Sequence, residues 1–252
     1  AAMASVNFRD PPVVEVALSV QFDAVPGLAS YRSGELYGHW SGEYPVVSQQ
    51  GELPPLPPLD AEEGDLFLQV GGSSGSRLWF EAEDGGYLIQ LQADRLTVNW
   101  RRLTTQAYPR YPEVRSRFVA AWDGLVGALG GPPDANQIEV IYVNRVPRSP
   151  DRVLQGWDNP ICVQEDGRFN AVFERSLRLP AAKLAKGQTA LGGRYGEPTE
   201  TMLSLMVRAV PEVADMPIFA IDAAREYIVT RFKAITDKSM HEEWGVVDGS
   251  DA

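Results

Sequence analysis

Cysteine and histidine are scarce in this chain of 252 residues, which holds one cysteine, Cys162, and two histidines, His39 and His241. A single cysteine cannot form an internal disulfide, and it fits a reducing compartment. Zinc sites need clustered Cys and His ligands, which this set cannot supply. We therefore expect no transition metal and no cofactor, while an all-carboxylate magnesium or calcium site stays an alternative.

Long apolar runs are also missing. No stretch approaches the roughly 18 uninterrupted apolar residues that a membrane helix needs. The first ten residues have no apolar core of the signal-peptide type. We therefore expect a cytoplasmic protein without a membrane partner.

Lysine is absent from the first 182 residues, and the first lysine of the chain is Lys183. Residues 1–136 hold nine arginines and 17 acidic residues, and the whole chain has a formal net charge of −11. An acidic surface repels phosphate backbones, so we expect no general nucleic-acid binding.

Catalytic motifs are the fourth absence. Residues 71–75, GGSSG, fit the G-x-S-x-G pattern of a hydrolase, but that motif needs a helix directly after it. Residues 78–83 predict a strand instead, so the glycines indicate a hairpin loop and Ser73 is expected to be inert. No phosphate-binding glycine loop is present either. We expect a protein that is not an enzyme.

The chain does contain clear period-two and helical patterns. Residues 13–22 alternate apolar and polar side chains, as a half-buried strand does. Apolar stripes predict helices over residues 113–129 and 222–244, the second capped by Asp222, with a weak helix over 28–40. Residues 53–59, LPPLPPL, predict an extended loop, because proline removes donors and fixes φ. Further strands are expected over residues 65–70, 78–83, 87–92, 95–100, 138–146, 168–179, 181–191 and 200–210.

This order repeats. Each half contains a strand, an irregular segment, several strands and a long helix. We therefore predict an α+β fold with a largely antiparallel sheet, built from two similar halves over residues 8–136 and 137–245 and packed as one compact domain. The ends, residues 1–7 and 246–252, are expected to be flexible. In element order the halves resemble tandem helix-grip or TATA-box-protein-like units, and a coincidence of a common pattern is the alternative.

Five segments carry a resemblance to a family: PPVVEV, LIQLQADRLTVNWR, YPRY, YVNR and FKAITDK, at residues 11–16, 88–101, 108–111, 142–145 and 232–238. The chain resembles an uncharacterised, sporadically distributed bacterial family of about this length. The resemblance implies a bacterial source and one compact protein, and it implies no activity. Family members often have a histidine where Ala224 or Arg225 stands, which argues against a catalytic role there.

Polar residues on otherwise apolar strands are the candidate binding group: Asn99, Arg101 with its neighbour Arg102, Asn144 and Arg145. Burying such groups is costly unless they are paired. They predict either a pocket for an anionic ligand or partner carboxylate, or an internal ion pair of Arg145 or Arg101 with Glu15 or Glu139.

The leading functional expectation is a non-catalytic binding or adaptor protein that recognises another protein, in a defence or mobile-element context. Six tryptophans are candidate anchors for such a partner. Two alternatives stay open. One is a small-molecule-binding protein or enzyme with a polar pocket between the two halves, and the other is an acidic immunity-type partner of a basic toxin.

Overall fold

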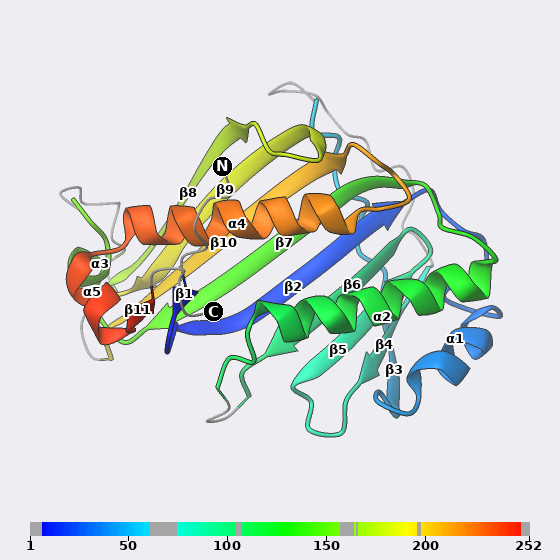
Figure 1. Ribbon diagram of the computed structural model, residues 1–252. Coiled ribbons are helices and arrows are strands. Elements are labelled where there is room, and N and C mark those ends of the chain that lie inside the picture. Colours follow the sequence, from blue (N-terminus) through cyan, green and yellow to red (C-terminus); the bar gives the residue numbers. More distant parts are fainter. Residues whose placement is uncertain are drawn as a thin grey trace.

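The computed structural model describes residues 7–60, 75–103, 107–156, 164, 166–195 and 198–247. The strand expected over residues 65–70, Ser73 and Cys162 lie outside the described residues. Within them, a nine-stranded antiparallel sheet carries two long helices on one face (Figure 1). The expected α+β class with a large antiparallel sheet is confirmed.

The sheet has the order β3-β4-β5-β6-β2-β7-β10-β9-β8. Its strands are β2 (Val13–Phe22), β3 (Val46–Gly51), β4 (Ser76–Glu81), β5 (Tyr87–Gln92), β6 (Arg95–Arg101), β7 (Ala135–Val146), β8 (Arg168–Leu177), β9 (Ala182–Arg194) and β10 (Glu200–Pro211). From the centre outward, one side runs β2, β6, β5, β4 and β3, and the other runs β7, β10, β9 and β8. Each side is followed along the chain by one of the long helices.

The helices are α1 (Ser33–Trp40), α2 (Tyr111–Leu129), α3 (Pro150–Val153), α4 (Ile218–Ile235) and α5 (Lys238–Glu243). A separate two-stranded ribbon pairs β1 (Asn7–Phe8) with β11 (Val246–Val247), so segments near the two ends of the chain lie side by side. Figure 1 shows this ribbon at the end of α4.

Alternation along β2 decides which face of the sheet is apolar. Val16, Leu18 and Val20 are fully buried under the helices, while Ser19 and Gln21 point to the opposite face, called here the open face. Val16 and Leu18 lie opposite Tyr142 and Val140 of β7, so the two central strands contribute to one core. Burying such side chains contributes about 1.5–3 kcal/mol each.

The helix α2 follows its predicted stripe. Val114, Phe118 and Leu125 are buried against the sheet. The helix ends at Gly130, which has a φ of 75° in the left-handed region that glycine adopts without steric cost. The predicted end of this helix at residue 129 is therefore confirmed.

The last predicted helix is wrong in two respects. It begins at Ile218, so Asp222 lies inside α4 and does not cap it. It also breaks after Ile235, because Thr236 is extended (ψ 151°) and forms a bridge with Leu154. Asp237 then caps a separate helix, α5, by accepting a hydrogen bond from the Ser239 amide at 2.9 Å.

Candidate ligand cavity between the two long helices

A cavity of about 650 Å³ lies on the helix-covered face, where α2 begins and α4 passes over β7. Its walls come from β1, β2, β7, β10, β11, the start of α2 and one side of α4. Because β2 and β7 are the two central strands, the cavity lies at the junction of the two sides of the sheet. Its volume falls within the range of about 300–1,000 Å³ typical of small-molecule sites.

Most of the cavity wall is aromatic or aliphatic. The apolar lining residues include Phe8, Val13, Leu205, Ile228, Val229, Phe232 and Val247. Three tyrosines, Tyr108, Tyr111 and Tyr142, complete this wall. Such a lining favours a ligand with an apolar body, held in place by a few polar groups.

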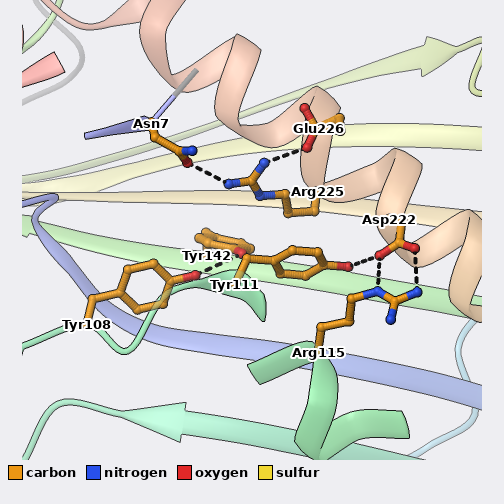
Figure 2. A network of polar contacts seen from close by, with 8 residues as sticks. All are labelled: Asn7, Tyr108, Tyr111, Arg115, Tyr142, Asp222, Arg225 and Glu226. Carbon is orange, nitrogen blue, oxygen red and sulfur yellow. Dashed lines mark hydrogen bonds and ion pairs between the residues drawn. The ribbon is translucent and has the colours of Figure 1, made fainter. Parts of the chain in front are cut away.

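Two of the tyrosines form a hydrogen-bonded pair. The hydroxyl oxygens of Tyr108 and Tyr142 lie 3.2 Å apart (Figure 2). The Tyr108 ring also packs edge-on against Trp100. Burial raises the pKa of both tyrosines above its ordinary value. Both hydroxyls therefore keep their protons at neutral pH. The hydrogen bond between them uses one of the two protons, so the other hydroxyl can donate to a ligand acceptor.

The third tyrosine connects the two long helices. The Tyr111 hydroxyl donates to Asp222 Oδ1 at 2.5 Å, and Arg115 binds the same carboxylate through Nε at 2.8 Å and Nη2 at 2.9 Å (Figure 2). Burial raises the pKa of Tyr111, and its hydrogen bond to Asp222 acts in the same direction. The fork-like geometry holds the beginning of α2 beside α4 and so fixes the width of the cavity there.

Arg225 is the buried cation of the cavity, with 8% of its surface exposed. It donates from Nη1 to Glu226 at 2.5 Å and from Nη2 to Asn7 at 3.0 Å, and its guanidinium lies 5.1 Å from the centre of the Tyr111 ring. Burial alone lowers the pKa of Arg225, but Tyr142 and Glu226 outweigh it and raise the pKa. The group therefore stays charged.

A second arginine, Arg110, lines the cavity just before α2 begins. Arg110 precedes α2 with a φ of 78°, a conformation that non-glycine residues adopt rarely and that is common at functional sites. Its guanidinium donates to the carbonyls of Phe8 and Arg9. Arg110 thereby connects the end of β1 to the start of α2.

Of the five residues that the sequence singles out, one, Asn144, lines the cavity. Asn144 is 2% exposed, lines the cavity from β7 and donates to the Leu203 carbonyl at 3.1 Å. Asn99 lies on the open face, where it donates to Glu15 at 2.9 Å and accepts from Gln90 at 2.7 Å.

Both predicted arginine pairings are wrong. Arg101 binds Glu81 at 3.4 Å, on the neighbouring part of the open face. Arg145 binds Glu200 at 2.5 Å, and its side chain is 61% exposed. Arg145 lies opposite Met202 near the start of β10, which brings Glu200 within reach. Glu139 is six residues away on the same strand as Arg145, too far for an ion pair in any register.

The sequence interpretation overlooked Tyr108, Tyr111, Asp222 and Arg225 as site residues. Tyr108 and Tyr111 stand in the YPRY segment that contributes to the family resemblance, directly before a long helix. Arg225 stands on the apolar side of α4, between the buried residues Ala224 and Ile228. A charged residue within a buried stripe was the available indication.

His241 is also titratable, and its contacts are those of a packed side chain. His241 Nε2 lies 2.8 Å from Thr236 Oγ1, its ring packs against Phe8, and burial lowers its pKa. The described residues contain no cluster of three His, Cys, Asp or Glu that could hold a metal ion. They also include no helix long and apolar enough to cross a membrane.

No family model, no curated protein and no solved structure matches the chain. The family resemblance described above therefore stays a prediction.

Proposed function

We propose that this chain is a non-catalytic binding protein whose ligand occupies the cavity between α2 and α4. The carrying observation is the cavity itself, which combines an aromatic wall with a few converging polar side chains at the junction of the two sides of the sheet. This is the pocket between two halves that was the first alternative from the sequence.

The polar lining favours a ligand with an acidic group. Three lining residues are arginines, Arg9, Arg110 and Arg225, against one acid, Glu226. This local excess of positive charge contrasts with the net charge of −11 for the chain. The start of α2 also lines the cavity, and the N-terminal end of a helix favours negative charge. An amphipathic acid, with an aryl or alkyl body and a carboxylate, fits both parts of the lining.

Binding is favoured over catalysis by the protonation states. The three lining tyrosines and Arg225 have raised pKa values, so they hold their protons throughout the physiological range. General acid–base catalysis works best with a group that titrates near the working pH. These four groups serve better as fixed hydrogen-bond donors.

We also infer that the two sides of the sheet are similar halves in a TATA-box-protein-like arrangement. The strand order supports this, because β2, β6, β5 and β4 correspond to β7, β10, β9 and β8 when counted from the centre. Each set is followed by a long helix, α2 or α4. In this proposal the cavity lies near the axis that relates the halves, and β3 is an addition to the first half.

Recognition of another protein is a second candidate function. It is supported by the edge strand β8, where Val172 and Phe173 are 60% and 54% exposed. An exposed edge strand presents unpaired backbone groups to a partner. We also propose, from the sequence, that the protein is bacterial and cytoplasmic, which is compatible with ligand binding and with recognition of another protein.

A thermal-shift series tests the ligand proposal. The probes are aryl and alkyl carboxylates of about 12–20 non-hydrogen atoms, each paired with its neutral amide. We expect a subset of the acids to raise the Tm, with about 2.7 kcal/mol of stabilisation at a hundredfold excess over Kd, and the amides to act more weakly.

Two variants of α4 localise the effect. Val229→Trp fills the cavity from the helix and should abolish the shift, because Val229 lines it. Phe219→Trp is the matched control, since Phe219 lies on the same helix, is 48% exposed and does not line the cavity. A shift that survives Val229→Trp, or a series in which no acid acts, would contradict the proposal.

A further inference from the structure

The proline-rich segment of residues 53–59, called here the strap, crosses the open face of the sheet. Leu53 contacts β5 and Pro54 contacts β6. Leu56 contacts β2 and β7, and Pro57 contacts β7 and β10. These are five neighbouring strands. The strap thus runs across the sheet from the first side to the second, on the face opposite the cavity.

One polar side chain from each of these five strands contacts the strap. In sheet order they are Gln92, Arg95, Gln21, Gln137 and Arg208. The first four are buried, with 2–7% of their surfaces exposed. Polar side chains in such a row are costly to bury unless each finds a partner, and here the partner is the strap.

The carbonyls of the strap accept from this row. Gln92 Nε2 donates to the Leu53 carbonyl at 3.0 Å and Arg95 Nη2 donates to Pro54 at 2.8 Å. Gln137 Nε2 donates to the Pro57 carbonyl at 3.1 Å, and Arg208 donates to the same carbonyl.

The amides of the strap are matched as well. Over residues 53–57 only Leu53 and Leu56 have an amide N–H, because the other three are prolines. Leu53 N donates to Gln92 Oε1 at 3.2 Å and Leu56 N donates to Gln21 Oε1 at 2.6 Å. The row therefore complements the main chain of an extended Leu-Pro-Pro-Leu-Pro segment, donor against acceptor.

Little of the strap's stability comes from its side chains. Leu53 is 40% exposed, all four prolines are exposed, and Leu59 alone is buried, at 5%. Release of the strap would uncover polar side chains that water can satisfy, together with one leucine. Exchange of the strap for another segment of the same chemistry therefore costs little apolar burial.

We propose that the open face is a binding site for an extended, proline-rich segment of a partner protein, and that the strap occupies this site as an intramolecular substitute. Proline-rich segments are already extended when free, so they lose little conformational entropy on binding. The strap competes at the high effective concentration of a tethered segment, so the partner binds when the strap is released.

The test uses a chain in which residues 53–59 are replaced by alternating Gly and Ser, and a labelled peptide of sequence LPPLPPL. We expect the peptide to bind this chain at least about tenfold more tightly than the wild type, in which the strap competes. The matched peptide LAALAAL, whose extra amides find no acceptor, should bind more weakly. Adding Gln21→Ala and Gln137→Ala to the replaced chain should abolish binding.

Absence of peptide binding to the folded replaced chain would overturn the proposal. So would a dimer of the wild type that dissociates when the strap is replaced, since the occupant would then be the strap of a second copy. If the chain with the replaced strap does not fold, hydrogen exchange on the wild type tests the proposal instead. We expect the Leu53 and Leu56 amides to exchange at least about tenfold faster than the Leu18 and Val140 amides of the central strands. Equal rates would mean that the strap opens only on global unfolding, and would overturn the proposal.

Discussion

The two faces of the nine-stranded sheet bury their side chains by different means. The face under α2 and α4 is filled by aliphatic and aromatic residues such as Leu18, Val140 and Phe118, all at most 1% exposed. On the open face, buried glutamines and an arginine lie under seven residues that cover them mainly through main-chain hydrogen bonds.

The two faces therefore differ in how easily their contacts can be exchanged. An apolar core is lost as a unit, because each side chain packs against many others and a cavity left behind is costly. A polar layer under an extended segment can exchange its protein partners for water. The helix-covered face is therefore suited to a fixed cavity, and the open face to an exchangeable segment.

The largest difference between the faces should appear on truncation of Phe118. Phe118→Ala removes a ring that is 1% exposed beneath α2 and should reduce the free energy of unfolding by about 3–5 kcal/mol. Phe173→Ala, on the exposed edge strand β8, should change it by no more than about 0.5 kcal/mol. Urea unfolding followed by tryptophan fluorescence measures both. Similar losses for the two variants would remove the distinction.

A smaller loss is expected from the open face. Arg95→Ala removes the donor to the Pro54 carbonyl and one of the two donors to Gln21 Oε1, and it should cost about 1–3 kcal/mol. Arg101→Ala on the same strand breaks the pair with Glu81, in which both side chains are 25% exposed, and should cost about 0–1 kcal/mol. The same urea titration compares them, and an Arg101 variant that loses more than the Arg95 variant would contradict the assignment of the strap contacts.

The smallest effect is pH-dependent and belongs to Glu139. Burial raises the pKa of this carboxyl above 4.5, although Arg95 and Arg208 lower it in part. A raised folded-state pKa means that the wild type loses stability as the pH rises from the unfolded-state value through the folded-state value. Glu139→Gln removes this loss, so the variant should gain stability relative to the wild type as the pH rises above about 4.3, the ordinary pKa of a glutamate. A difference that is constant over this range, or that grows toward acid pH, would contradict the direction.

The apolar face could be predicted from the sequence, while much of the open face could not. Alternation along β2 and the stripe of α2 follow from periods of 2 and 3.6 residues, which both elements keep. Gln21 and Arg95 occupy outward positions in this pattern and are nevertheless buried, because the strap covers them. Its prolines predict an extended conformation, but no local pattern says where an extended segment packs.

The cavity was predictable only as a place between two halves. Its walls come from segments separated by up to about 240 residues, such as Phe8 and Val247, which local periodicity cannot bring together. Asn144 was found because a polar residue interrupts a buried strand. The pair of Arg145 with Glu200 could not be predicted, because it depends on the register between β7 and β10. Neither strand's own sequence specifies that register.

The most direct test of a ligand site between α2 and α4 is a backbone NMR titration with an acid that raises the Tm of the wild type. We expect chemical-shift changes for Asn144, Leu205 and Val229, which line the cavity, and none for Gln21 and Gln137 on the open face. Shifts confined to the open face, or to the edge strand β8, would contradict a ligand site between the two long helices.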